Sequence, residues 1–246
     1  MSFTFMLGTH VLSHLDKTEV TLFVSFRQLR KRVKKPFNRK QPIYVDSGGF
    51  SELSLYGEWT ISPQEYIDGL EHLKRLGLTI GWAAPQDYMC EPIMLEKTGL
   101  TIREHQQRTV NNLIALRSLT DIHIIPVLQG QTLSDYYHHF EMYELAGFNL
   151  RDEKVVGVGS VCRREATDEI KHIIKSLHAK GLNLHGFGVK INGLKKYKQH
   201  LVSSDSLAWS YGARYNPPCQ SCASRSVKNC ANCLHYALKW RLKVVA

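Results

Sequence analysis

Ile43-Tyr44-Val45-Asp46-Ser47-Gly48-Gly49-Phe50 joins a short apolar run to an acid, two glycines and an aromatic ring. The apolar run is typical of a buried strand, and a carboxylate at its C-terminal end lies where barrel enzymes carry out their chemistry. The glycines let the backbone approach a flat ligand, and the ring of Phe50 offers a surface on which a base can stack. The same residues also fit an ordinary strand-to-helix turn capped by Asp46, so this stretch alone leaves both interpretations open.

Strand and helix patterns alternate on both sides of this stretch. Eight apolar or β-branched runs predict strands, at Phe3–Leu7, Val20–Phe26, Ile43–Val45, Leu78–Ala84, Ile122–Leu128, Val155–Val158, Leu184–Val189 and Leu201–Ser203. Four amphipathic patterns predict helices over residues 62–76, 101–119, 133–146 and 167–180. This alternation predicts an α/β fold, a (β/α)8 barrel of the TIM type. An open doubly wound sheet is the alternative, but no glycine-rich dinucleotide fingerprint follows the first predicted strand.

Composition narrows the class of protein. The chain has 246 residues, of which 43% are hydrophobic, as expected of a folded globular protein. No apolar run is long enough to span a bilayer, and the N-terminal stretch lacks the marks of a signal peptide, so we expect a cytoplasmic, reducing setting. Lys and Arg number 32 against 22 acidic residues, which favours a polyanionic partner. A basic surface without a partner is the alternative, and for the basic segment Arg27–Lys40 a solvated loop is the favoured interpretation.

Four cysteines near the C-terminus form a C-x2-C-x7-C-x2-C pattern: Cys219, Cys222, Cys230 and Cys233. In a reducing compartment, paired C-x2-C units indicate tetrahedral zinc rather than disulfides. Four sulfurs complete the coordination shell, so the predicted zinc is structural. His235 could replace one sulfur, but a place on the final helix is favoured for it. We therefore predict a catalytic barrel over residues 1–215 and a zinc-binding module with a terminal helix over residues 216–246.

Polar residues follow several of the predicted strands. Asp46, Asp87 and Asp205 stand at or after strand ends, together with Gln129 and the glycine-rich run Val155–Ser160. Each acid alone is more often a helix cap or a paired core group. In a barrel, however, these ends converge, and their joint occurrence predicts one pocket with three carboxylates, an amide and room for a flat ring.

These motifs resemble a known family. The segments DSGGF (46–50), QDYMC (86–90), LQG (128–130), VGVGS (156–160), GFGVK (186–190) and SSDS (203–206), followed by the zinc cysteines, occur in the order seen in tRNA-guanine transglycosylases. The resemblance runs from about residue 43 to residue 233. It is closest to the short DpdA-type enzymes, often phage-encoded, that place 7-deazaguanines in DNA.

The resemblance implies a base exchange in which an aspartate attacks C1′ of a guanosine, guanine leaves, and a 7-deazaguanine displaces the aspartate. Position matching assigns Asp205 as the nucleophile and Asp46 as the general acid/base. The implied base-binding residues are Ser47, Gly48, Phe50, Asp87, Gln129, Gly157 and Gly159. Lys190 and Arg214 would hold the flanking phosphates.

The residue types suit this chemistry independently of the family. A carboxylate can trap an oxocarbenium-like carbon, as in retaining glycosidases, and a second group must handle the proton of the departing purine. Guanine presents N1–H and N2–H2 donors, for which a carboxylate is a natural acceptor. A base within a duplex must be flipped out, or lie in a single strand, before it can react.

Two sequence differences from the tRNA enzymes indicate which nucleic acid is modified. Their C-x-C-x2-C…His zinc pattern is replaced here by two C-x2-C pairs, and the segment after Asp205 is Ser206-Leu207-Ala208-Trp209-Ser210-Tyr211. No appended RNA-binding domain is expected, and together these points favour DNA as the polymer that is modified. The inserted base would be a 7-deazaguanine such as preQ0, and the setting a bacterial or phage-infected cell. A tRNA-modifying enzyme and a non-catalytic zinc-containing nucleic-acid-binding barrel are the alternatives. No membrane partner is expected; a homodimer and accessory modification proteins are the further partners considered.

Overall fold

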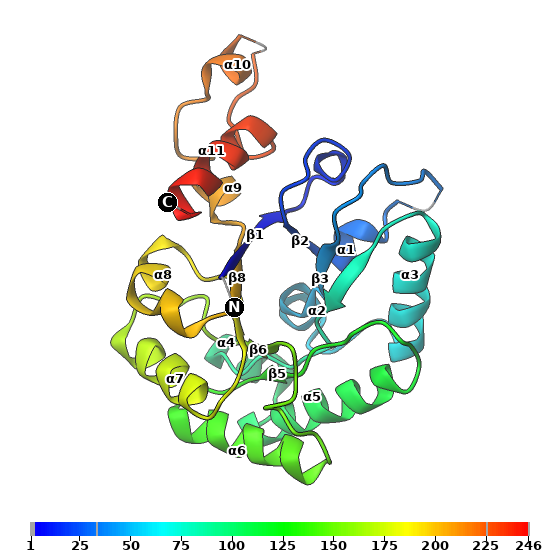
Figure 1. Cartoon of the computed structure of the whole chain (residues 1–246), viewed down its shortest axis with the longest axis vertical. Coiled ribbons are helices and arrows are strands. Elements are labelled where there is room, and N and C mark those ends of the chain that lie inside the picture. Colours follow the sequence, from blue (N-terminus) through cyan, green and yellow to red (C-terminus); the bar gives the residue numbers. More distant parts are fainter. Residues whose placement is uncertain (1–2, 33, 225, 246) are drawn as a thin grey trace.

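The computed structural model of the protein describes residues 3–32, 34–224 and 226–245. The N-terminal stretch, for which no signal peptide is predicted, begins with residues 1–2, and these lie outside the described ranges. Eight parallel strands form a single sheet in the order β4-β3-β2-β1-β8-β7-β6-β5, which curls round on itself (Figure 1). The strands are β1 Thr4–Thr9, β2 Leu22–Ser25, β3 Ile43–Asp46, β4 Ile80–Ala83, β5 Val127–Leu128, β6 Val156–Val158, β7 Leu184–Gly186 and β8 Ser203–Ser206. The predicted α/β barrel architecture is confirmed.

One bridge joins the two edges of the curled sheet. The amide of Ala83 in β4 donates to the carbonyl of His123 at 2.9 Å, and the amide of Ile125 donates back to Ala83 at 3.0 Å. Pro126 follows at once and has no N–H to donate to a ladder. The strand predicted over residues 122–128 is therefore divided into this bridge and the two-residue β5.

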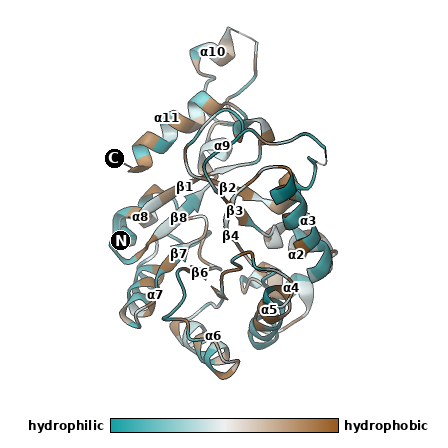
Figure 2. Ribbon diagram, turned by 45° about the vertical axis from the view of Figure 1, so that its right-hand side comes forward, coloured by the Kyte–Doolittle hydropathy of each residue, from teal (hydrophilic) through white to brown (hydrophobic). Residues whose placement is uncertain are grey.

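Helices cover the outside of the sheet. They are α1 Phe26–Leu29, α2 Gly49–Tyr56, α3 Pro63–Arg75, α4 Pro92–Thr98, α5 Ile102–Arg117, α6 Leu133–Leu145, α7 Asp168–Ala179 and α8 Ile191–Tyr197, with 3-10 turns η1 Leu12–His14 and η2 Lys198–His200. The four predicted helices correspond to α3, α5, α6 and α7. Capping boxes at Ser62, Thr101 and Thr132 start the first three of these, because each side chain accepts a hydrogen bond from the amide three residues on. In Figure 2 the outward sides of α3 and α7 are mainly hydrophilic, as expected for helices packed on a sheet.

The core has two layers because side chains alternate along each strand. A large cluster between strands and helices contains one set of strand residues, among them Leu7, Val24 and Val45. A second cluster holds residues of the other set, among them Phe23 and Trp82, and fills the barrel interior. The inner layer supports the C-terminal ends of the strands from below.

The C-terminal part of the chain follows β8 and comprises α9 Ala208–Gly212, α10 Gln220–Ala223 and α11 Leu234–Val245. It lies at one end of the molecule, beside β1 and β8 (Figure 1). The indole of Trp209 donates to the carbonyl of Gly8 at 2.7 Å, and the ring of Trp240 lies 6.0 Å from that of Phe5. These contacts fasten this part of the chain to β1. Within the described residues, no helix is long and apolar enough to cross a membrane.

Candidate active site

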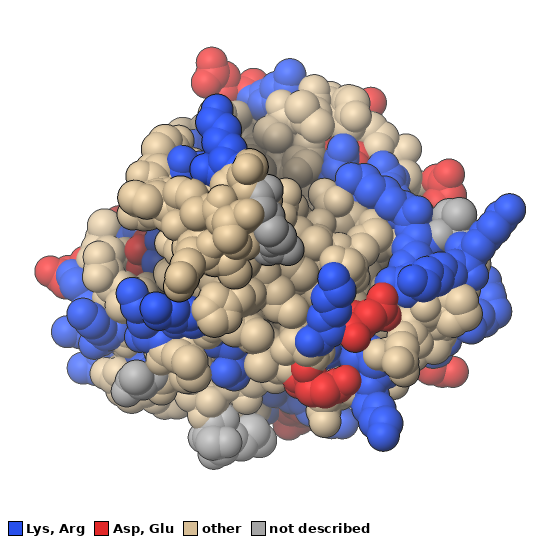
Figure 3. All heavy atoms as spheres, turned by 90° about the horizontal axis from the view of Figure 1, so that it is seen from above, with Lys and Arg blue, Asp and Glu red and all other residues tan. Residues whose placement is uncertain are grey.

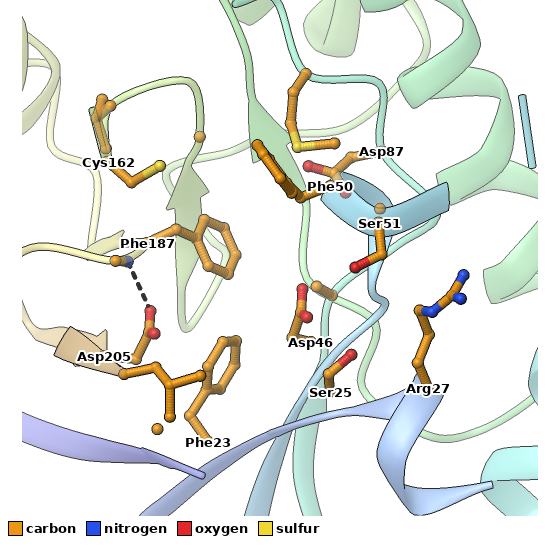
Figure 4. Close-up of a pocket in the computed structure, with 18 of the residues that line it drawn as sticks. Phe23, Ser25, Arg27, Asp46, Phe50, Ser51, Asp87, Cys162, Phe187 and Asp205 are labelled. Carbon is orange, nitrogen blue, oxygen red and sulfur yellow. Dashed lines mark hydrogen bonds between the residues drawn. The ribbon is translucent and has the colours of Figure 1, made fainter. Parts of the chain in front are cut away.

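A cavity of about 400 Å³ opens at the C-terminal ends of the strands, and each of the eight strands or the loop that follows it contributes to the wall. Asp46, Asp87 and Asp205 all line it, together with Gln129 and Gly159. In Figure 4 the side chains of Asp46 and Asp205 point into the same space from opposite walls. The sequence-based prediction that the three acids share one pocket is confirmed by this geometry.

Asp205 lies within β8, one residue before its end, and is held from one side. The amide of Gly188 donates to its Oδ1 at 2.9 Å (Figure 4), and Nε2 of His185 lies 3.3 Å from the same oxygen. Within the described part of the chain no hydrogen bond reaches Oδ2, so the carboxylate presents one bound oxygen and one oxygen for a ligand. This asymmetry suits a nucleophile whose orientation must be fixed.

Asp46 is the last residue of β3, and the turn behind it begins α2. The pKa of Asp46 is raised to about 6, mainly by burial and also by the nearby charge of Asp205, while hydrogen bonds from the Gly48 amide and the Ser25 hydroxyl oppose the shift. Gly48 has a φ of 90°, a left-handed conformation that favours glycine and lets its amide turn back to the carboxylate. A carboxyl group with this pKa can both give and take a proton near neutral pH.

Asp87 is part of a buried hydrogen-bonded chain. Gln129 Nε2 donates to Asp87 Oδ2 at 2.5 Å, and Gln129 Oε1 accepts from the Ser160 hydroxyl at 2.5 Å. The Ser160 oxygen accepts a hydrogen bond from the amide of Cys90 at 2.8 Å. Its hydroxyl proton is therefore left for Gln129, and this fixes the donor-to-acceptor direction of the hydrogen bonds in the series. Burial, and then the charge of Asp46, raise the pKa of Asp87 to about 7.

Ser160 and Gly159 form a tight corner beside Gln129. Ser160 has a φ of 56°, uncommon for a residue other than glycine, and its side chain holds both Gln129 and Cys90. A Cβ at Gly159 would lie 2.3 Å from Gln129 Nε2, so only glycine leaves the amide in place. This part of the wall is shaped around the Asp87–Gln129 pair.

Three residues predicted to bind the base lie behind the wall rather than in it. Ser47 is buried and its hydroxyl lies 3.5 Å from Asp87 Oδ1, and Gly48 makes the turn. A Cβ at Gly157 would meet the Phe187 ring at 2.5 Å, so this glycine makes room for a residue that lines the cavity. They support the cavity through their neighbours.

Phe50 stands at the mouth of the cavity. Its side chain is 41% exposed, which leaves a ring face free for stacking, and the guanidinium carbon of Arg163 lies 5.4 Å from the ring centroid. Lys190 and Arg214 are exposed and do not line the cavity.

Part of the basic segment Arg27–Lys40 has a structural role. Arg39 is buried and donates to the carbonyls of Thr18 and Val20, and Arg32 pairs with Asp16 at 2.8 Å. Arg27 lines the cavity and pairs with the buried Glu52 on α2. Other members, including Lys34, Lys35 and Lys40, are exposed. Figure 3 shows Lys and Arg side chains over much of this face of the molecule, with fewer acidic groups between them.

Sequence reasoning missed His185, Ser160 and Glu91 as site residues. His185 and Ser160 contact the predicted residues, and Glu91 lines the cavity. A histidine within the short buried run of β7 is a signal in itself, because a buried polar group needs a partner. Its partner could not be read from the sequence, since it stands on the adjacent strand.

The four C-terminal cysteines form a cluster. Their Sγ atoms all lie within 4.8 Å of one another, and those of Cys219 and Cys233 are 4.0 Å apart. Tetrahedral Zn–S bonds of about 2.3 Å place sulfurs about 3.8 Å apart, so the arrangement fits such an ion. His235 is exposed and does not belong to the group that could hold a metal, which comprises cysteines alone within the described ranges.

The turn between Cys230 and Cys233 contacts the loop after β1. The side-chain oxygen of Asn232 lies 2.7 Å from His10 Nε2, and its carbonyl lies 3.2 Å from His14 Nε2. His10 lines the cavity, so the cysteine cluster is joined to the cavity mouth through one residue.

Comparison with known proteins assigns the chain to a family. The sequence pattern of the DpdA family, DeoxyPurine in DNA protein A, matches residues 1–246. No curated protein matches the chain. Two crystal structures of a "putative isomerase" from Sinorhizobium meliloti, one in an open loop conformation, align with a TM-score of 0.41 at 8% and 9% identity. The alignments cover 83% of this chain and 50% of theirs, so the chain spans half their length. The match over its whole length shows that the chain belongs to the DpdA family, DeoxyPurine in DNA protein A.

Proposed function

We propose that the protein exchanges guanine in DNA for a 7-deazaguanine through a covalent aspartyl-glycosyl intermediate. The observation that carries the proposal is the meeting of Asp46, Asp87 and Asp205 in one cavity at the C-terminal ends of the strands. Membership of the DpdA family supports a DNA-modifying transglycosylase.

In the first half-reaction, the free oxygen of Asp205 attacks C1′ of the target nucleoside. The C1′–N9 bond breaks, its electron pair leaves with guanine, and Asp46 supplies the proton that the departing purine needs. The pKa of about 6 supports this role, because a fraction of Asp46 is protonated near neutral pH. The product is an ester between Asp205 and the sugar.

In the second half-reaction, the 7-deazaguanine occupies the place that guanine has left. The Asp46 carboxylate takes the proton from N9–H, N9 attacks C1′, and the ester bond to Asp205 breaks. Two successive displacements restore the original configuration at C1′, as in retaining glycosidases. Asp46 and Asp205 return to their starting states, so the cycle needs no further reactant.

The Asp87–Gln129 pair would recognise the base. An ionised Asp87 can accept from the N1–H and N2–H2 groups that guanine and 7-deazaguanines share. Gln129 already donates to one Asp87 oxygen, which orients the carboxylate. The ring of Phe50 at the mouth would stack on the flipped nucleotide or its neighbour.

The cysteine cluster would hold a structural zinc ion. Cys219, Cys222, Cys230 and Cys233 supply the four sulfur ligands, and the ion would contribute folding energy rather than a reaction step. Lys190 and Arg214, which are exposed, would contact phosphates outside the cavity. We further propose that residues 1–215 form the catalytic barrel and residues 216–246 the zinc module.

Isotope exchange with trapping of the intermediate tests the proposal. The purified protein is incubated with labelled base and either duplex DNA, single-stranded DNA or tRNA, and the nucleosides are analysed by mass spectrometry. We expect label in DNA and, on denaturation, a protein–DNA adduct. Asp205→Asn should abolish the adduct while retaining base binding, whereas Asp168→Asn, an exposed aspartate on α7, should behave as the wild type.

Each result decides between the alternatives. Label in tRNA but not in DNA would support the tRNA-modifying alternative. Absence of exchange in every polymer would refute the enzymatic function and leave a nucleic-acid-binding barrel. An adduct that persists in Asp205→Asn would show that another residue is the nucleophile.

A further inference from the structure

His185 is a fully buried polar residue in the barrel interior, directly beneath the cavity. It is the central residue of β7 and has no exposed surface. Three aromatic rings surround it, with centroid distances of 5.6 Å to Phe23, 4.9 Å to Trp82 and 4.7 Å to Phe187. An imidazole in such apolar surroundings requires polar partners at its two nitrogens.

The two nitrogens of the ring face side chains of the adjacent strand β8. Nδ1 lies 2.9 Å from the hydroxyl of Ser203, and Nε2 lies 3.3 Å from Oδ1 of Asp205. Among the described residues Nε2 makes no hydrogen bond, so a buried ring nitrogen without a partner faces the carboxylate of Asp205. Catalytic hydrogen bonds are often long or poorly aligned before substrate binds and tighten in the complex.

The hydrogen-bond roles follow from the chemistry of the partners. An ionised carboxylate accepts hydrogen bonds and donates none, so a neutral His185 must carry its proton on Nε2. Nδ1 then accepts from the Ser203 hydroxyl, which can rotate to donate. The Gly188 amide donates to the same Asp205 oxygen at 2.9 Å.

We propose that His185 is a positioning residue that, with the Gly188 amide, holds Asp205 Oδ1 and directs Oδ2 at the sugar. The inference rests on the proposed function, because it assigns a role around the same nucleophile. During the second half-reaction the ester between Asp205 and C1′ breaks and its electron pair returns to the carboxylate. The two N–H donors then stabilise the negative charge that develops on Oδ1, without any proton transfer.

Substitutions separate this role from a role in packing. His185→Phe suits the aromatic surroundings but removes the donor, and should slow both adduct formation and adduct breakdown about 10- to 100-fold, the worth of a hydrogen bond to a charged group. His185→Gln retains a side-chain N–H and should recover most of that loss. Neither variant should change the affinity for free base, since His185 does not touch the Asp87–Gln129 pair. The effect should thus appear in kcat and not in KM for the base.

A matched control is available at another buried histidine. His105 on α5 also lacks exposed surface, and its nitrogens bond to the Met89 carbonyl and the Thr98 hydroxyl at 2.7 Å each. His105→Gln should destabilise the fold yet leave the rate of adduct formation within about twofold of the wild type. Thermal unfolding of all variants shows whether each is folded at the assay temperature.

A second measurement does not depend on turnover. ¹⁵N NMR of protein labelled at histidine should show His185 protonated at Nε2, with a signal that shifts in Asp205→Asn. A neutral His185 protonated only at Nδ1 would overturn the inference, since a lone pair would then face the carboxylate. Wild-type rates in a folded His185→Phe would also overturn it while leaving the proposed function intact. Absence of any adduct in the wild type would instead refute the function, and with it the role assigned to His185.

Discussion

Asp87→Asn should stabilise the protein above neutral pH while lowering its affinity for the base. The pKa of Asp87 is raised from 3.8 to about 7, mainly by burial. The folded state therefore binds this proton more tightly than the unfolded state, and the contribution of Asp87 to stability falls as pH rises from about 4 to about 7. With about 1.4 kcal/mol for each pKa unit, ionised Asp87 destabilises the fold by about 4 kcal/mol at pH 8.

Urea unfolding of both proteins at several pH values measures this effect. The difference in unfolding free energy between Asp87→Asn and the wild type should grow by about 3 kcal/mol between pH 5 and pH 8, because that interval spans most of the titration. Asp121→Asn, at an exposed aspartate, provides the control. A difference for Asp87→Asn that is the same at both pH values would refute the reasoning. Calorimetric titration should show weaker base binding, since the amide replaces one acceptor oxygen with an NH2 group, which cannot accept from the guanine donors.

Three further outcomes are expected. Adduct formation should fall about tenfold per pH unit above about pH 7, because Asp87 is then ionised while Asp46, with a pKa of about 6, must still carry a proton to assist the departing purine; a rate that is flat to pH 9 would contradict that role. Gly159→Ala should abolish base binding and lower the melting temperature, since the new methyl group would displace the buried Gln129 from its hydrogen bonds; unchanged affinity in a binding titration would count against this account. Zinc chelation or Cys222→Ser should lower the melting temperature, and an unaltered melting temperature would argue against a structural ion. The same changes should release the His10 side chain from Asn232, which a changed NMR signal of His10 would show.

Much of the fold could be predicted because its signals are local. Helix α3 begins at a capping box, and the four predicted helices end within two residues of their observed ends because caps and periodicity act over one turn. The strand predicted over residues 122–128 was longer than β5, since Pro126 removes a ladder donor and the bridge at Ile124 forms before it. The short α2, α4 and α8 lacked a long amphipathic pattern and were not predicted.

The candidate site could be predicted in part for a geometric reason. Asp46, Asp87, Asp205 and Gln129 follow or end strands, and the ends of parallel strands meet at one edge whatever their separation along the chain. Gly157 was expected in the wall and instead makes room for Phe187, because which glycine faces the cavity depends on how the neighbouring ring packs.

By itself the sequence determined the alternation of strands and helices, the cysteine spacing that suits a metal, and the acids that line the cavity. Only the tertiary structure decided which polar groups touch. His185 meets Asp205 because β7 and β8 pair with His185 opposite Ser203, which brings together side chains from two strands. Alternation along a strand tells which residues share a face, but the hydrogen-bond register between strands sets which of them become neighbours, and that register is fixed when the whole barrel packs.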